Sequence, residues 1–243
     1  MSVQTEINAF LKKINSSQTI RVSAYEAPKS PKLNSYIDHT ALSASLTEKE
    51  VRTLCDEAKT HHFMAVCVNP VWVKYASSLL KGTEVKVCTV VGFPLGTHSS
   101  SVKVFETAEA IENGATEIDM VIHIGALKDK EYLTVLEDIK AVAYACKKKA
   151  LLKVIIETCE LTDEEVLQAS VLCRLAGADY IKTSTGFGSA GATEKHILIM
   201  RAVAGDVLGV KASGGVRDKD TALKMINAGA SRIGASASVQ IVA

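Results

Sequence analysis

The segment Asp179-Tyr-Ile-Lys-Thr-Ser-Thr-Gly186 is a short apolar run that ends in a polar turn with a glycine. Leu208-Gly-Val-Lys-Ala-Ser-Gly-Gly-Val216 repeats this pattern further along the chain. Each run carries a lysine, Lys182 or Lys211, in its second half. Short β-branched runs that alternate with helical segments are typical of parallel α/β proteins.

Eight such runs alternate with helical patterns from Leu33 onward. Consecutive centres lie roughly 20 to 36 residues apart, close to the ~30 residues per unit of an eight-stranded βα barrel. The sequence therefore predicts an α/β fold, a (β/α)8 TIM barrel with a short N-terminal helical extension. A doubly wound open sheet is the alternative. The predicted strand centres are Ile37, Val66, Val87, Ile118, Ile155, Ile181, Val210 and Ile233.

Helix signals fill the intervening segments. Thr47 with Glu50, and Thr162 with Glu165, have the spacing of a capping box. Glycines follow Asn113, Ala176 and Ala228, where helices should end. Only residues 234–243 remain after the last strand, so we expect a short closing helix.

Residues 1–30 differ from the rest, and residues 31–243 form the predicted barrel domain. Ile7, Phe10, Leu11 and Ile14 follow i, i+3, i+4, i+7 spacing, which predicts an amphipathic helix. We expect this extension to cap one end of the barrel.

Composition narrows the function classes. The chain has 243 residues, 47% of them hydrophobic, which is enough for one large core. A net charge of +1 argues against nucleic-acid or membrane-surface partners. The run Lys147-Lys-Lys149 fits a solvated helix end. Neither a membrane-spanning run nor a signal-peptide pattern is present, and the cysteines are scattered, so we expect a reduced, cytoplasmic protein.

Three charged residues are predicted to share the barrel interior. Strand side chains alternate between the interior and the helices, and catalytic groups gather at carboxyl strand ends. With their apolar neighbours facing the helices, Asp119, Lys182 and Lys211 would face the axis. A buried lysine beside a second cation loses its proton more readily, and a neutral amine can attack a carbonyl. This pattern indicates Schiff-base chemistry.

A second pair has the same parity. Lys153 and Glu157 would lie on one face of the fifth strand, where they could complete an interior charge network. A supporting role and a catalytic role both remain open for this pair.

The turns after the last three strands are small and rich in backbone donors, as phosphate sites require. Barrels often bind phosphate with the loops after strands seven and eight. Ordinary tight turns also use such residues, but three adjacent loops favour phosphate. The candidate residues are Thr185, Gly186, Ser213, Gly214, Gly215, Gly234 and Ser236.

Two other site types fit poorly. Gly186-Phe-Gly-Ser-Ala-Gly191 matches G-x-G-x-x-G, but the acid that a dinucleotide site needs is misplaced, since Asp206 begins the next strand. His61 and His62 are neighbours and would point apart on a helix, and no His-Glu-x-x-His motif exists. We therefore expect no metal and no cofactor.

These residues carry a family resemblance. From about Leu33 onward the chain resembles the deoxyribose-phosphate aldolases, class I aldolases on a (β/α)8 barrel. The matching stretches are Tyr36-Ile-Asp-His-Thr40, Val66-Cys-Val-Asn-Pro70, Val87-Cys-Thr-Val-Val-Gly-Phe-Pro-Leu-Gly96, Glu117-Ile-Asp-Met-Val121, Val154-Ile-Ile-Glu-Thr158, Tyr180-Ile-Lys-Thr-Ser-Thr-Gly-Phe187, Lys211-Ala-Ser-Gly-Gly-Val216 and Arg232-Ile-Gly-Ala-Ser236.

The resemblance implies reversible cleavage of 2-deoxy-D-ribose 5-phosphate to acetaldehyde and D-glyceraldehyde 3-phosphate. It implies that Lys182 is the nucleophile, that Lys211 favours its neutral form, and that Asp119 joins Lys211 and a water in proton transfer. Asp38 and Thr40 would orient substrate hydroxyls. Gly186, Gly214, Gly215 and Ser236 would hold the phosphate of this small phosphorylated sugar. A homodimer or a higher homo-oligomer is compatible with the sequence.

Three departures from the family pattern stand out. His123 occupies a position where bacterial relatives often have Asn, Ala237 follows Ser236 where a second Ser is common, and the sequence lacks a terminal tyrosine. Two alternatives remain open. One is a catalytically idle relative that acts as a phosphate- or protein-binding scaffold. The other is a Schiff-base aldolase for keto acids, in which Arg217 would bind the carboxylate.

Overall fold

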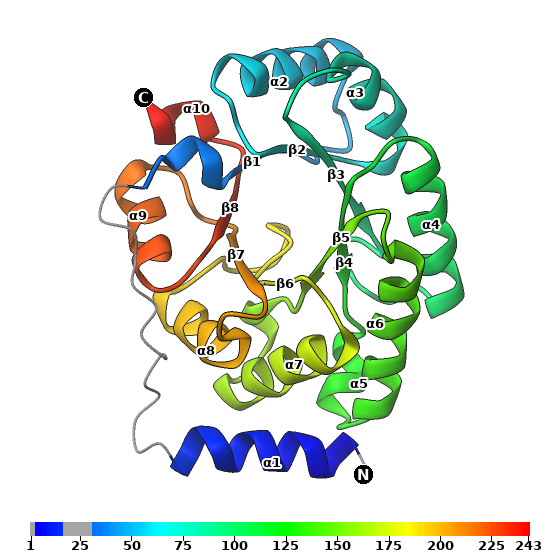
Figure 1. Cartoon of the computed structure of the whole chain (residues 1–243), viewed down its shortest axis with the longest axis vertical. Helices are drawn as coiled ribbons and strands as arrows, with labels where there is room; N and C mark the ends of the chain where they lie inside the picture. The colour runs from blue at the N-terminus through cyan, green and yellow to red at the C-terminus, as the bar shows by residue number, and fades with distance from the viewer. Residues whose placement is uncertain (1–2, 17–30) are drawn as a thin grey trace.

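The computed structural model describes residues 3–16 and 31–243, and it shows a closed barrel of parallel strands inside a ring of helices (Figure 1). Neighbouring strands pair in chain order, and β1 pairs with β8 to close the barrel. The predicted TIM barrel is confirmed, and the doubly wound alternative is wrong. The strands are β1 (Ile37–Ala41), β2 (Ala65–Val68), β3 (Lys86–Val91), β4 (Glu117–Val121), β5 (Leu151–Ile155), β6 (Tyr180–Lys182), β7 (Gly209–Ser213) and β8 (Arg232–Ala235).

Helices follow the strands and cover the outside of the barrel (Figure 1). Every predicted strand centre falls inside a strand, with Ile155 as the last residue of β5. The helices are α1 (Val3–Ser16), α2 (Glu48–Thr60), α3 (Val73–Leu79), α4 (Ser100–Glu112), α5 (Ile124–Lys128), α6 (Tyr132–Cys146), α7 (Asp163–Ala176), α8 (Glu194–Ala204), α9 (Lys219–Asn227) and α10 (Ser238–Val242), with short 3-10 turns η1 (Leu33–Tyr36), η2 (Pro70–Trp72) and η3 (Thr158–Glu160).

Strand alternation divides the apolar side chains into two clusters. Residues such as Ile118, Ile181 and Val210 are fully buried in the large cluster between strands and helices. A small cluster lies apart from it and comprises Leu42, Ala65, Cys67, Cys88 and Val90. The alternation predicted from the sequence is therefore present. Several strand positions that belong to neither apolar cluster carry buried polar and charged side chains.

The N-terminal helix does not cap the barrel as expected. Helix α1 packs against α7 and α6 on the outside of the helical ring (Figure 1). Ile7 is fully buried there, so one face of the helix is apolar as predicted. The side chains of Phe10, Leu11 and Ile14, and residues 17–30 with the predicted domain boundary, lie outside the described residues.

The predicted helix ends are present. Thr47 and Thr162 both form complete capping boxes, at the starts of α2 and α7. Gly177 caps the C-terminal end of α7, and its φ of 80° is the left-handed conformation that favours glycine. The closing helix α10 is short, as expected. In the part of the chain that the structure describes, no helix has the length and apolar character needed to cross a membrane.

The capping box of α7 gives a stability prediction. In Thr162→Ala the N–H of Glu165 loses its acceptor, so the free energy of unfolding should fall by about 1 kcal/mol in urea denaturation. Thr162→Ser keeps the hydroxyl and should stay within about 0.5 kcal/mol of the parent. An equal loss in both variants would show that the cap hydrogen bond does not stabilise the helix.

Candidate active site

Charged side chains from six strands meet inside the barrel and are almost completely buried. The register explains the meeting, because Asp119 pairs with Lys153, Lys182 with Lys211, and Lys211 with Arg232 on neighbouring strands. We call this set the interior cluster; it comprises Asp38, Glu117, Asp119, Lys153, Lys182, Lys211 and Arg232.

Asp119 lies at the centre of the interior cluster. Its Oδ2 accepts hydrogen bonds from Lys182 Nζ at 2.7 Å and from Lys211 Nζ at 2.8 Å. Its Oδ1 accepts from Lys153 Nζ at 2.8 Å and faces the thiol of Cys88 at 3.2 Å. The two lysines singled out in the sequence, Lys182 and Lys211, thus share the carboxylate of Asp119. Lys153 binds the same carboxylate.

The far side of the cluster was not anticipated. Arg232 Nη1 donates to Asp38 Oδ1 at 2.6 Å and to Glu117 Oε2 at 3.0 Å. Lys153 also binds Glu117, at 2.6 Å. Glu117 shares its parity with Asp119, so the alternation along β4 could have identified it.

Burial and opposite charge act against each other in this cluster. Burial alone would raise the pKa of Asp119, but Lys153, Lys182 and Lys211 hold it well below its usual value. Burial alone would lower the pKa of Lys211, but Asp119 and Asp38 hold it above its usual value. The charged form of Lys211 is therefore favoured next to the amine of Lys182.

A cavity of about 260 Å³ opens at the carboxyl ends of the strands, where the loops after β1, β6, β7 and β8 meet. Of the interior cluster, Lys182 alone lines it, so one lysine connects the cluster to the cavity. The candidate phosphate residues and Thr40 line it too. The lining residues are Thr40, Leu42, Ser43, Lys182, Thr185, Gly186, Phe187, Ser213, Gly214, Gly215, Val216, Arg217, Gly234, Ala235 and Ser236.

Asp38 lies away from the cavity, although it was expected to orient a substrate hydroxyl. It is fully buried, and its oxygens bind Arg232 and Lys211. It does not line the cavity. The geometry gives Asp38 the task of holding cations in place, and direct contact with a substrate hydroxyl is not what this placement supports.

The glycine motif between β6 and α8 has a packing explanation. A Cβ atom on Gly191 would lie 2.1 Å from the carbonyl oxygen of Gly214, and one on Gly188 would lie 2.6 Å from Cys159 Sγ. Helix α8 begins only at Glu194, beyond the motif. These glycines bring loops together, and they do not open a helix as a dinucleotide site requires.

Lys153 and Glu157 do not act as a pair. Strand β5 ends at Ile155, and Glu157 has a left-handed φ of 53°. Lys153 points into the interior cluster, whereas Glu157 binds the loop at Thr185. The expectation that they share one strand face is wrong, because the chain turns before Glu157.

His123 has a local role. Its Nδ1 accepts a hydrogen bond from the N–H of Ala126 at 3.0 Å and so caps helix α5. Asparagine is a preferred N-cap residue, so histidine can do the same job at this position.

Two residue groups in the described chain are close enough to hold a metal ion: Cys67, Cys88 and Asp119, and Asp38, Cys88 and Glu117. Their carboxylate oxygens already accept hydrogen bonds from the lysines and Arg232 of the interior cluster. The donor chemistry of both groups therefore suits ammonium and guanidinium partners.

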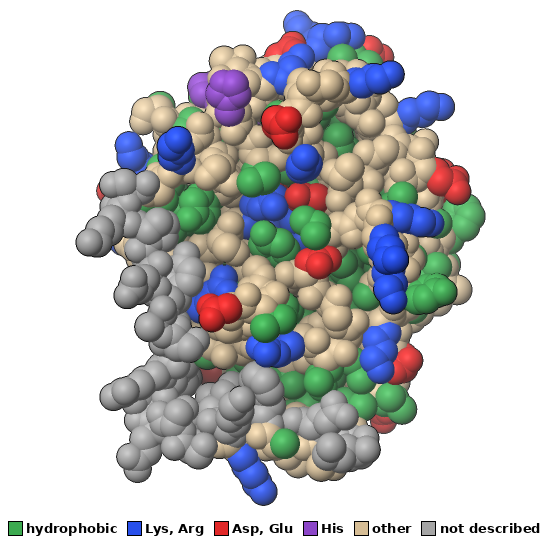
Figure 2. All heavy atoms as spheres, viewed as in Figure 1, with side chains coloured by type: hydrophobic (Ala, Val, Ile, Leu, Met, Phe, Trp, Pro, Cys, Tyr) green, Lys and Arg blue, Asp and Glu red, His purple; other side chains and the backbone are tan. Residues whose placement is uncertain are grey.

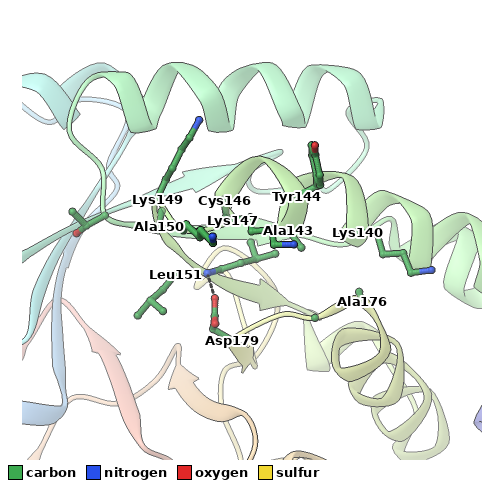
Figure 3. Close-up of a pocket in the computed structure, with 14 residues that line it drawn as sticks. Lys140, Ala143, Tyr144, Cys146, Lys147, Lys149, Ala150, Leu151, Ala176 and Asp179 are labelled. Atoms are coloured by element: carbon green, nitrogen blue, oxygen red, sulfur yellow. Dashed lines mark hydrogen bonds between the residues drawn. The ribbon is translucent and has the colours of Figure 1, made fainter.

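A second hollow lies at the opposite ends of the strands, where α6 leads into β5 (Figure 3). Lys140, Tyr144 and Lys147–Lys149 line it, and positively charged side chains gather over the end of α6 in Figure 2. The run of three lysines is exposed there, as expected. No residue of the interior cluster lines this hollow.

Comparisons with known proteins identify the family of this chain. The model of the DeoC/LacD family aldolases matches residues 33–239. The chain belongs to this family. The deoxyribose-phosphate aldolase of Clostridium tetani is 55% identical over 86% of this chain and 97% of its own length. That of Halalkalibacterium halodurans is 60% identical over 85% of this chain and 92% of its own length.

Solved structures give the same result. A Coccidioides immitis protein, provisionally assigned as a deoxyribose-phosphate aldolase, superposes with a TM-score of 0.93 at 43% identity, covering 100% of this chain and 97% of its own. The tetrameric deoxyribose phosphate aldolase of Aeropyrum pernix has a TM-score of 0.82 at 34% identity, covering 93% and 96%. The chain is therefore an aldolase, an enzyme of the carbon–carbon lyase class.

The buried position of Asp38 predicts how stability depends on pH. Asp38→Asn should lower the free energy of unfolding at pH 7 by about 3–5 kcal/mol, because Lys211 and Arg232 lose a charged partner. Burial opposes the shift, but Lys211, Lys153 and Arg232 lower the pKa of Asp38 in the folded state. Its contribution is present above the ordinary carboxyl pKa of about 3.9 and is lost as pH falls towards the folded value.

Urea denaturation between about pH 5 and pH 2 tests this, and the parent should lose stability more steeply than Asp38→Asn. Asp56→Asn is the control, since it removes a largely exposed ion pair with Lys59 and should change stability by less than about 1 kcal/mol. Parallel curves for parent and Asp38→Asn would contradict the expected linkage.

Proposed function

We propose that this aldolase cleaves 2-deoxy-D-ribose 5-phosphate reversibly to acetaldehyde and D-glyceraldehyde 3-phosphate through a Schiff base on Lys182. The observation that carries the proposal is the position of Lys182. It alone of the interior cluster lines the cavity, and its Nζ contacts the carboxylate oxygen that Lys211 also binds.

The charges of the interior cluster suit a neutral nucleophile. The cluster contains Lys153, Lys182, Lys211 and Arg232 against Asp38, Glu117 and Asp119, so it carries one excess positive charge when all groups are ionised. One cation of the cluster is therefore in excess over the carboxylates. Lys182 is the lysine that lines the cavity, so a substrate carbonyl can reach its Nζ.

The chemistry follows from an amine in this place. Lys182 Nζ adds to the C1 carbonyl of the open-chain sugar, and the carbinolamine loses water to give an iminium ion. Removal of the proton from the C3 hydroxyl breaks the C2–C3 bond, and the bonding electrons move into the iminium to give an enamine. The three-carbon aldehyde phosphate departs. Protonation of the enamine carbon and hydrolysis then release acetaldehyde and restore the amine.

Asp119 and Lys211 are the groups proposed to move protons during these steps. Both contact each other and lie next to Lys182, so a water in the cavity could link them to the substrate. Thr40 lines the cavity from β1 and is the candidate for a sugar hydroxyl. Asp38 acts through Lys211, which it holds against Asp119.

The phosphate is proposed to bind between the loops after β6, β7 and β8. Gly186, Gly214 and Gly215 have φ values of 87°, 78° and 78°, which permit backbone N–H groups to face an anion. Ser236 and Arg217 line the same cavity. Arg217 also suits the alternative function, an aldolase for keto acids, because an exposed guanidinium can bind a carboxylate.

The Schiff base has a direct test. Borohydride reduction with acetaldehyde should attach one ethyl group to the parent at Lys182, found by mass spectrometry of peptides. Lys182→Ala and Lys182→Arg should show no labelling at this position and no turnover, because neither has a primary amine there. Lys149→Ala, an exposed lysine on the opposite side of the barrel, should behave as the parent.

Labelling at another lysine in the parent would refute the assignment. Absence of any labelling would favour the idle scaffold. Pyruvate used in place of acetaldehyde distinguishes the keto-acid alternative, which predicts that pyruvate is the better trapped donor.

The role of Asp119 can be measured on the donor half-reaction. Enamine formation exchanges the methyl protons of acetaldehyde for deuterium in D2O, which NMR detects. Asp119→Asn should slow this exchange by about 10²–10⁴-fold, since proton transfer by a positioned group contributes on that scale. Urea denaturation shows whether the variant is folded at the temperature used. Exchange by a folded Asp119→Asn at the parent rate would remove Asp119 from the proton relay.

A further inference from the structure

Glu157 is buried between β5 and η3, and its side chain is not part of the interior cluster. It is 5% exposed and has a left-handed backbone, with φ 53° and ψ 69°. A non-glycine residue in this conformation is energetically unfavourable and persists where the surroundings impose it, often at functional sites. No described residue forms an ion pair with Glu157, so hydrogen bonds are the polar contacts of its carboxyl group among those residues.

All but one of those hydrogen bonds come from the loop after β6; the other comes from the thiol of Cys159 in η3, which donates to Glu157 Oε1 at 3.7 Å. The backbone N–H of Thr185 lies 3.3 Å from both carboxylate oxygens of Glu157. The Thr185 hydroxyl donates a short hydrogen bond to Glu157 Oε2. The same hydroxyl oxygen accepts from the N–H of Phe187 at 3.0 Å. Glu157, Thr185 and Phe187 therefore form one connected chain that determines the turn at Gly186.

This chain decides what the loop offers to the cavity. Both donors of Thr185 are used by Glu157, so Thr185 has no hydrogen left for a phosphate oxygen. Gly186 and the ring of Phe187 remain exposed to the cavity. The contribution of Thr185 to a phosphate site is then to position Gly186.

Close packing behind the loop supports the same conclusion. Gly188 passes so near that a Cβ atom would lie 2.6 Å from Cys159 Sγ and 3.4 Å from the carboxyl carbon of Glu157. On the other side the Phe187 ring meets Phe93 edge-on, with 5.4 Å between centroids. The loop is thus held between Glu157 and Phe93. Among the described residues, the Thr185 hydroxyl donates only to Glu157, so a residue without an acceptor at position 157 leaves this hydroxyl without a partner for its hydrogen.

We infer that Glu157 is a positioning residue for the phosphate end of the substrate, and that through Thr185 it sets the preference for a phosphorylated over an unphosphorylated 2-deoxy sugar. This inference rests on the proposed function. Glu157 touches neither the cavity nor the interior cluster, so its effect on the reaction must pass through the loop.

The test uses Glu157→Gln and Glu157→Gly with 2-deoxyribose 5-phosphate and with 2-deoxyribose. Glu157→Gly suits the left-handed backbone but leaves both Thr185 donors without an acceptor. It should raise KM for the phosphorylated sugar by about tenfold, with kcat within about threefold and kcat/KM for 2-deoxyribose unchanged. Glu157→Gln keeps an acceptor oxygen and should have an intermediate KM.

Thr185 provides the matched controls. Thr185→Val should reproduce the rise in KM, and Thr185→Ser, which keeps the hydroxyl, should be near the parent. The double variant Glu157→Gly with Thr185→Val should lose little more than either single variant, because both remove the same interaction.

A binding measurement separates this inference from the reaction itself. Calorimetry with inorganic phosphate should show a dissociation constant about tenfold weaker in Glu157→Gly than in the parent. Failure of the Schiff base would abolish trapping at Lys182 and leave this difference in phosphate binding intact.

Three results would overturn the inference: equal losses of kcat/KM with both sugars, parent-like kinetics and phosphate binding in Glu157→Gly, or fully additive losses in the double variant. Equal losses accompanied by a lower melting temperature would assign Glu157 a purely structural role.

Discussion

The carboxylate of Asp119 is the interaction on which the site depends. One buried side chain accepts hydrogen bonds from three lysines on three different strands. Ammonium groups rarely leave water without such compensation. Because the barrel is closed, neighbouring strands cannot move apart to let water reach them. The same carboxylate therefore compensates for the loss of hydration of the buried lysines. It also brings Lys182 and Lys211 together, because both donate a hydrogen bond to its Oδ2.

The four cations of the interior cluster differ in how many acidic groups hold them, and this difference sets Lys182 apart. Lys153, Lys211 and Arg232 are held by two or more acidic groups each, and none of the three lines the cavity. Among the described residues, Asp119 is the single acidic partner of Lys182, and Lys182 also lines the cavity. In the proposed reaction, Lys182 is thus the lysine of the cluster that has the fewest acidic partners and that a substrate in the cavity can reach.

Much of the fold could be predicted because each signal is local. Alternation placed Asp119, Lys182 and Lys211 correctly on the interior face, and the capping boxes marked two helix starts. Arg232 and Glu117 were missed because charges at the beginning of a strand usually reach solvent, and only barrel closure brings these two together. Glu157 was misplaced because parity assumes an extended chain, and a left-handed non-glycine residue leaves no sequence signal. The stripe on α1 predicted a buried face, but the partner of that face is a tertiary property.

The contact of Gly191 with Gly214 has a consequence for changing the specificity of this enzyme. The backbone of the loop after β6 rests on that of the loop after β7, with Ala192 N–H donating to both Ser213 and Gly214 carbonyls. The two loops cannot be redesigned independently at this contact, since a side chain added at Gly191 would displace the backbone of Gly214. Variant libraries aimed at new aldehydes should therefore mutate both segments jointly and leave this glycine pair untouched.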